Sequence, residues 1–183
     1  NSTNGFISGT PTVSGIFNFT AQVTDAGSPA QNTNQALSIV VSQANATRIW
    51  PSAPTPGTPD GGPDASVELG VKFTSDVAGS IYGIRFYNSA ANIGTHVGNL
   101  WDTNGLLLGS AVFTNESASG WQQVNFPTPV MIASNTVYVA SYHTDVGHYS
   151  SDTNYFITNV DNPPLHALSS AAAGGNGVFG YGT

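Results

Sequence analysis

The stretch Val67-Glu68-Leu69-Gly70-Val71-Lys72-Phe73 carries the pattern that decides the fold of this chain. Apolar side chains stand at every odd position, and Glu68 and Lys72 stand between them. Successive side chains of a strand point to opposite faces, so this alternation predicts a half-buried β-strand. No segment of the chain sustains a helical period over three turns. The sequence therefore predicts an all-β fold.

More strands are expected downstream at regular spacing. Runs of β-branched and aromatic residues predict strands over 80–87, 121–126, 136–143 and 155–157. Residues 99–101 and 106–113 flank the turn Asp102-Thr103-Asn104-Gly105 and predict a hairpin. Pro127 and Pro129 are expected to separate two of these strands. The Ala-rich residues 165–173 predict at most one short helix. Short, evenly spaced strands predict an antiparallel, jelly-roll-like β-sandwich.

Residues 15–41 predict two more strands in the N-terminal part of the chain. Apolar and polar residues alternate over 16–24 and again over 37–41, and the turn cluster Asp25-Ala26-Gly27-Ser28-Pro29 lies between them. Two strands are only marginally stable in water, so they should belong to a larger domain. The Pro- and Gly-rich residues 50–63 predict a semi-extended linker or a long loop that leads into the sandwich.

The N-terminal motifs resemble the immunoglobulin-like (cadherin-like) repeats of bacterial surface proteins. The resemblance rests on 5–11, 15–19, 23–25 and the Leu-Ser-Ile-Val-Val run at 37–41. It implies that residues 1–43 are the C-terminal half of such a repeat, whose first strands would precede Asn1.

A second resemblance covers about Ile49 to Thr183 and rests on many motifs in order. The chain is similar to a bacterial extracellular family catalogued as domain of unknown function 4082, and the matching motifs are 68–73, 83–87, 94–96, 100–101, 120–122, 129–130, 138–143, 147–149 and 174–177. Such modules accompany secreted carbohydrate-active enzymes and large surface proteins. Family members continue into one more strand, so this resemblance implies that 67–183 is a sandwich lacking its last strand, preceded by a linker and loop at 44–66.

Composition narrows the possible partners. Only 7% of the residues are charged, Lys and Arg total 3, and the formal net charge is −7. Nucleic acid is excluded because phosphate binding needs clustered cations, and no apolar run is long enough to insert into a membrane. Gly, Ser, Thr and Asn take the place of most charged residues, and this composition indicates an extracellular or cell-surface location. Polysaccharide, a divalent cation and a second copy of the chain remain as partners.

No residue pattern indicates catalysis. Glycoside hydrolysis needs two carboxyl groups flanking a scissile bond, and no pair of carboxylates stands in an apolar setting. The nucleophile elbow Gly-x-Ser-x-Gly is absent from the sequence. The chain is therefore predicted not to be an enzyme.

Calcium is the cofactor that the sequence suggests. Asp60, Asp64 and Glu68 lie in or beside a Gly-rich loop, and carboxylate oxygens in such loops suit this hard cation. Their spacing fits no EF-hand loop. Solvated turn residues are the alternative interpretation.

The predicted ligand-binding residues are aromatic, imidazole and guanidinium side chains. His143, His148 and Tyr149 are expected to line a groove, and Arg85 and Tyr87 share one face of a strand. Trp101 and Trp121 are expected in the core. The resulting hypothesis is a non-catalytic recognition or adhesion module with carbohydrate as ligand. The alternative is a structural or filament-forming subunit, in which copies with incomplete sheets complement one another by strand addition.

Overall fold

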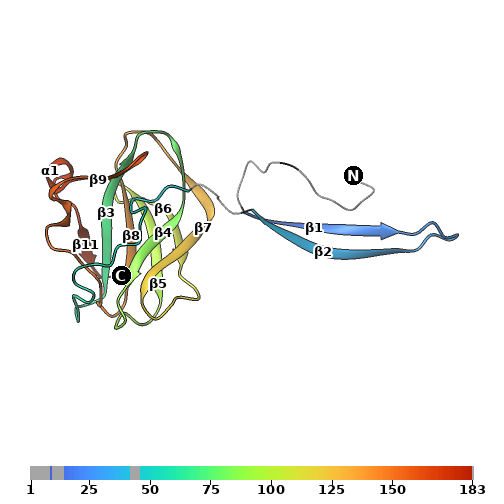
Figure 1. The fold of residues 1–183 in the computed structure, drawn as a ribbon, viewed down its shortest axis with the longest axis horizontal. Coiled ribbons are helices and arrows are strands. Elements are labelled where there is room, and N and C mark those ends of the chain that lie inside the picture. The colour runs from blue at the N-terminus through green and yellow to red at the C-terminus, as the bar shows by residue number, and fades with distance from the viewer. Residues whose placement is uncertain (1–8, 10–14, 42–45, 183) are drawn as a thin grey trace. The chain divides into compact units, whose positions relative to one another are not determined.

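The computed structural model describes residue 9 and residues 15–41 and 46–182 of the chain. The chain divides into two compact units, Asn1–Ala46 and Thr47–Thr183 (Figure 1). Among the described residues, no helix is long and apolar enough to cross a membrane.

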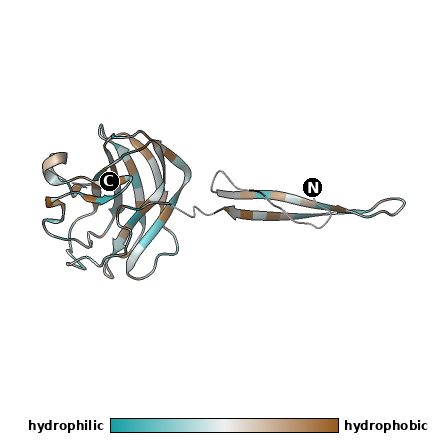
Figure 2. Ribbon diagram, turned by 45° about the horizontal axis from the view of Figure 1, so that its top comes forward, coloured by the Kyte–Doolittle hydropathy of each residue, from teal (hydrophilic) through white to brown (hydrophobic). Residues whose placement is uncertain are grey.

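The first unit contains one antiparallel hairpin. Strand β1 (Gly15–Thr24) pairs with β2 (Asn32–Val41), and Phe17 lies opposite Ile39. The carboxylate of Asp25 closes the turn by accepting hydrogen bonds from the backbone N–H groups of Gly27 and Gln31. Apolar and polar bands alternate along both strands (Figure 2). The two strands expected here are therefore present; the motif at 5–11 lies, except for Gly9, outside the described residues, and the immunoglobulin-like assignment stays a prediction.

The second unit is built from two antiparallel sheets. The larger sheet has the order β6-β5-β8-β3-β10-β9, with β11 also paired to β3. Its strands are β3 (Val67–Ser75), β5 (His96–Asp102), β6 (Leu107–Val112), β8 (Tyr138–Thr144), β9 (Val160–Asn162), β10 (Leu165–Ala167) and β11 (Val178–Tyr181). The smaller sheet pairs β4 (Gly79–Asn88) with β7 (Gly120–Ile132). This architecture confirms the predicted all-β sandwich.

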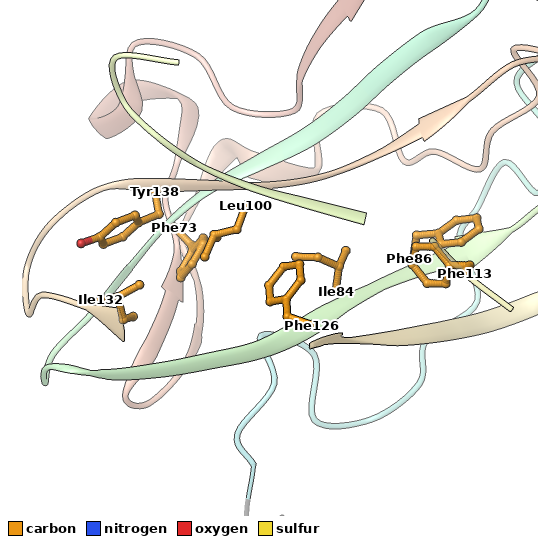
Figure 3. Close-up of a cluster of buried hydrophobic side chains, with 8 residues drawn as sticks. All are labelled: Phe73, Ile84, Phe86, Leu100, Phe113, Phe126, Ile132 and Tyr138. Carbon is orange, nitrogen blue, oxygen red and sulfur yellow. The ribbon is translucent and has the colours of Figure 1, made fainter. Parts of the chain in front are cut away.

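The core lies between these two sheets and holds them together. The larger sheet contributes Phe73, Leu100 and Tyr138, and the smaller sheet contributes Ile84, Phe86, Phe126 and Ile132, with Phe113 at one end (Figure 3). Leu100 is 0% exposed. Burying a side chain of this size stabilises the fold by about 1.5–3 kcal/mol. Because alternate residues face inward, the residues between them form the two outer faces of the sandwich.

Two local predictions were wrong. Strand β7 runs through Pro127 and Pro129, which were expected to interrupt it. Its pairing register with β4 shifts between Ile81 and Gly83, and such a bulge on a two-stranded sheet accommodates residues that cannot donate to the ladder. Residues Tyr155–Ile157 form the 3-10 helix η1 and not a strand. The left-handed conformation of Asn154 (φ 58°) turns the chain immediately before it.

The Ala-rich segment contains the expected short helix. Helix α1 spans Ser170–Ala173 and begins at Ser169, whose hydroxyl accepts a hydrogen bond from the N–H of Ala172. Gly174, in the left-handed conformation, ends the helix.

The Pro- and Gly-rich residues that precede β3 lie against the sandwich. Thr58 and Ser151 exchange two backbone hydrogen bonds of 2.9 Å, and the N–H of Gly61 donates to the carbonyl of Tyr149 at 2.6 Å. A Cβ at Gly62 would stand 2.4 Å from the carbonyl oxygen of Gly147, so only glycine allows this close approach. Residues from Thr47 onward thus belong to the second unit.

Candidate functional site

The structure places the predicted site residues in three regions of the second unit. Glu68 and His143 lie on the outer face of the larger sheet, where β3 and β8 pair. Asp60, Asp64, His148 and Tyr149 meet where the loop before β3 contacts the segment after β8. Arg85 and Tyr87 lie on β4 in the smaller sheet.

A hydrogen-bonded network surrounds Glu68 on the outer face of the larger sheet. One carboxylate oxygen accepts hydrogen bonds from the amide of Asn99 (2.9 Å) and from the hydroxyl of Ser141. The indole N–H of Trp101 donates to the same hydroxyl at 2.8 Å. The second carboxylate oxygen is 3.4 Å from Nδ1 of His143. Both oxygens of Glu68 are therefore engaged by the protein.

The other imidazole nitrogen of His143 has two neighbours. Nε2 lies 3.1 Å from the hydroxyl of Ser66 and 3.2 Å from a carboxylate oxygen of Asp145. The order Ser66–His143–Glu68 is that of a hydrolase triad. However, the carboxylate of Asp145 competes with the Ser66 hydroxyl for the nitrogen that would act as the base.

The loop cluster fastens the chain before β3 to the segment after β8. Nδ1 of His148 is 3.0 Å from a carboxylate oxygen of Asp60, and this contact lowers the pKa of Asp60. Asp64 accepts hydrogen bonds from the hydroxyls of Tyr181 (2.7 Å) and Tyr149 (3.4 Å), and the bond from Tyr181 is the largest cause of its lowered pKa. Both carboxylates are therefore engaged by other side chains of the protein.

The three carboxylates predicted to bind calcium have different partners. Asp60 faces His148, Asp64 faces two tyrosines, and Glu68 lies in the network of the larger sheet. Within residues 46–182 and the other described parts of the chain, no group of three or more His, Asp or Glu side chains is placed to hold a metal ion. The calcium site stays a prediction.

Arg85 and Tyr87 lie on the outer face of the smaller sheet and meet a tryptophan there. In the β4–β7 pairing, Tyr87 lies opposite Trp121 and Arg85 lies opposite Gln123. The guanidinium carbon of Arg85 is 4.8 Å from the centroid of the Trp121 ring, a cation–π contact. The rings of Tyr87 and Trp121 meet edge to face, with centroids 5.9 Å apart. We define the Trp121 face as Arg85, Tyr87, Trp121, Gln123 and Asn125.

Residues from two other segments hold the Trp121 ring in place. Its indole N–H donates to the carbonyl of Pro54 at 2.9 Å, and the Trp50 ring lies 5.8 Å away. The indole N–H of Trp50 donates in turn to the hydroxyl of Tyr155. The Pro-rich stretch and η1 therefore border the Trp121 face.

The prediction that both tryptophans are core residues was wrong. The inward positions of β7 are taken by Gln122, Val124 and Phe126, so Trp121 points to the opposite face. Gln122 is tolerated inside because its amide bonds to Ser117 and to the Gly120 carbonyl. This parity was visible in the sequence, since Trp121 stands an odd number of residues from Phe126. This signal could have identified Trp121, Gln123 and Asn125 as residues of the outer face.

Trp101 lines a groove of about 470 Å³ on the opposite side of the sandwich. The groove runs over the outer face of the larger sheet toward α1 and is lined by Lys72, Trp101, Asp102, Thr103, Gly105, Val137, Val139, Leu168, Ala172, Ala173 and Val178. Lys72 spans it and donates from Nζ to the carbonyl of Ala173 at 2.8 Å. The carboxylate of Asp102 accepts hydrogen bonds from backbone N–H groups of its own turn, and these bonds are the main reason that its pKa is lowered. The polar side chains of this groove are thus largely engaged.

Comparison with known proteins identifies the family of this chain. A search of curated proteins finds no match. A family model described as a domain of unknown function matches residues 53–183, the sandwich together with most of the loop that precedes it. The match covers more than half of the chain, and it agrees with the motifs that run in order from the first strand of the sandwich to its last glycines. The chain therefore belongs to the family of domain of unknown function DUF4082.

Proposed function

We propose that this chain is a non-catalytic module of a secreted surface protein and that it recognises carbohydrate through the Trp121 face. The observation that carries the proposal is the arrangement of Tyr87, Trp121 and Arg85 on one outer face of the sandwich. Pyranose rings stack their C–H faces on aromatic rings, and guanidinium and amide groups bind their hydroxyls. The side chains of Gln123 and Asn125 are exposed on the same face and supply those amides.

The Trp121 face is formed before any ligand arrives. The contacts of Trp121 with Pro54 and Trp50 fix the ring plane. Its residues stand on paired strands and not on free loops. A preformed surface loses less conformational entropy on binding, which favours the weak contacts that sugars make.

An extracellular location is part of the proposal. It is supported by the low content of charged residues, 7%, and by the abundance of the turn-forming residues Gly, Ser, Thr and Asn. A role in adhesion would follow, since a surface module that binds glycans attaches its parent protein to whatever displays them.

Glycan arrays followed by calorimetry test the proposal. We expect the chain to bind at least one polysaccharide and expect Trp121→Ala to weaken that binding by about tenfold or more, since stacking contacts of this size contribute over 1 kcal/mol. Phe179→Ala is the matched control, because this ring on β11 is 66% exposed and lies outside the Trp121 face. Unfolding midpoints of both variants would show that the fold is intact.

Two results would refute carbohydrate recognition at this face. One is the absence of binding across the array. The other is a folded Trp121→Ala variant that binds as tightly as the unsubstituted chain.

Self-association is the second candidate function, and the β1–β2 hairpin favours it. Among the described residues, each of its strands pairs only with the other, so the outer edge of each strand has no described partner. Phe17, Leu37 and Ile39 are exposed on it, and Phe17 and Ile39 are cross-strand neighbours. Open edges and exposed apolar side chains favour strand addition from another copy. Sedimentation at increasing concentration tests this: larger species that Leu37→Asp abolishes support assembly, and a strictly monomeric chain excludes it.

A further inference from the structure

Among the described residues, the lysine and arginine side chains have no acidic partners. Lys and Arg total 3 in a chain of net charge −7. Within the described ranges, every ion pair has a histidine as its basic member. Arg48 and Arg85 therefore have no carboxylate within ion-pair distance there, although acidic residues outnumber basic ones.

One arginine lies on the Trp121 face, and the other is close in the sequence to a residue that packs on it. Arg85 is part of the face itself. Arg48 stands two residues before Trp50, whose ring packs on Trp121, and it is exposed. Burial lowers the pKa of Arg85, and the positive charge of Arg48 lowers it further.

This placement costs free energy in the unbound protein. A half-buried guanidinium loses part of its hydration, and a second positive charge nearby adds repulsion. The contact with Trp121 recovers a part of this cost. An anion beside Arg85 would recover more, because charge-assisted hydrogen bonds to a forked guanidinium are among the strongest in proteins.

We infer that the glycan bound at the Trp121 face is acidic and that Arg85 and Arg48 bind its anionic group, a carboxylate or a sulfate. In this arrangement a pyranose ring stacks on Trp121 and Tyr87, and its charged substituent lies toward the guanidinium groups. The inference rests on the proposed function and adds the class of sugar. The net charge of −7 would repel an acidic sugar at a distance, so selectivity must come from these local cations.

Calorimetry with matched short oligosaccharides tests the inference. The probes are a galacturonate trisaccharide, its methyl ester, and a sulfated and an unsulfated galactose trisaccharide. Short probes limit the long-range repulsion between the acidic ligand and the negatively charged protein. At 0.1 M salt this repulsion is largely screened beyond about 10 Å. We expect a charged probe to bind about tenfold tighter than its uncharged counterpart. The pair with the larger difference identifies carboxylate or sulfate as the group.

Substitutions of single cations make the test specific. We expect Arg85→Gln and Arg48→Gln each to weaken binding of the charged probe by about threefold to tenfold and to leave the uncharged probe within about twofold. Lys72→Gln is the matched control, because it removes the same charge from the groove on the other sheet. Arg48 is exposed, so its substitution keeps the test valid if Arg85→Gln unfolds the chain.

The possible results separate this inference from the function it builds on. If Trp121→Ala abolishes binding but charged and uncharged probes bind equally, carbohydrate recognition stands and the acidic ligand is refuted. The same holds if both arginine variants keep the full preference for charge. If Trp121→Ala changes binding of no probe, both proposals fail.

Discussion

Glu68 and His143 lie directly opposite each other on β3 and β8, with Nδ1 of the imidazole 3.4 Å from the carboxylate. The same carboxylate accepts hydrogen bonds from Asn99 on β5 and from Ser141 on β8. Glu68 therefore links three neighbouring strands through side chains, in addition to the backbone ladder. A residue that looked like a calcium ligand in the sequence is a central member of a polar network in the fold.

Removing this carboxylate should destabilise the sandwich. Glu68→Ala leaves the buried amide of Asn99 and the buried hydroxyl of Ser141 without their acceptor, which should lower the free energy of unfolding by about 1–3 kcal/mol. Urea unfolding followed by tryptophan fluorescence measures the change. Glu68→Gln keeps an acceptor oxygen and should cost less. Equal stability of Glu68→Ala and the unsubstituted chain would show that the network contributes nothing.

The stability of the fold should depend on pH through His166. The carboxylates of Asp76 and Asp161, whose oxygens lie 2.9 Å and 2.6 Å from the two ring nitrogens, raise the pKa of His166 above its usual value. Because the folded state holds the proton more tightly, this stabilisation is complete below the unfolded pKa of about 6.5 and is lost as pH rises through the folded pKa.

The unfolding midpoint should therefore fall as pH rises from the unfolded pKa through the folded pKa of His166. His166→Gln should remove that component of the pH dependence while leaving the other histidines in place. Proton NMR titration of the His166 ring provides a direct check. A ring that titrates at or below the value of free histidine would contradict the prediction.

Gly147 should be intolerant of a side chain. Its φ is +59°, and a Cβ there would stand 2.2 Å from the carbonyl oxygen of Asp64. The left-handed backbone alone costs a residue with a Cβ about 1–2 kcal/mol, and the clash adds to this cost. We expect Gly147→Ala to lower the unfolding midpoint and to loosen the loop before β3. Gly79→Ala is the control, since nothing lies within 4 Å of its Cβ position, and equal effects of the two substitutions would refute the argument.

The non-catalytic proposal predicts that Ser66 is unreactive. Its hydroxyl is 3.1 Å from Nε2 of His143, but the carboxylate of Asp145 is 3.2 Å from the same nitrogen. A fluorophosphonate probe, detected by intact mass, should therefore leave the chain unmodified. Stoichiometric labelling that Ser66→Ala abolishes would instead make the Ser66–His143–Glu68 group a working triad.

Local sequence patterns predicted most of the strands. Alternation predicted β1, β2 and β3, residue composition predicted β4 and β8, and the turn at Asp102 predicted the β5–β6 hairpin. The failures have non-local causes. Strand β7 continues through two prolines because a bulge in its pairing with β4 accommodates them. Residues Tyr155–Ile157 have strand-like composition, yet they form a helical turn after the left-handed Asn154.

The side chains that share a strand face can be identified from the amino-acid sequence alone, because this depends only on the parity of neighbouring positions. Arg85 and Tyr87 were placed together in this way. The residues that lie opposite Arg85 and Tyr87 across the sheet follow from the tertiary structure alone. The register of β4 against β7 brings Trp121 and Gln123 across from them, and this register depends on the bulge at Ile81–Gly83 and on the packing of Ile84 and Phe126 in the core. The residues that face each other across a sheet depend on the strand register, and the register is set by the simultaneous burial of many residues. A local sequence pattern therefore cannot predict them.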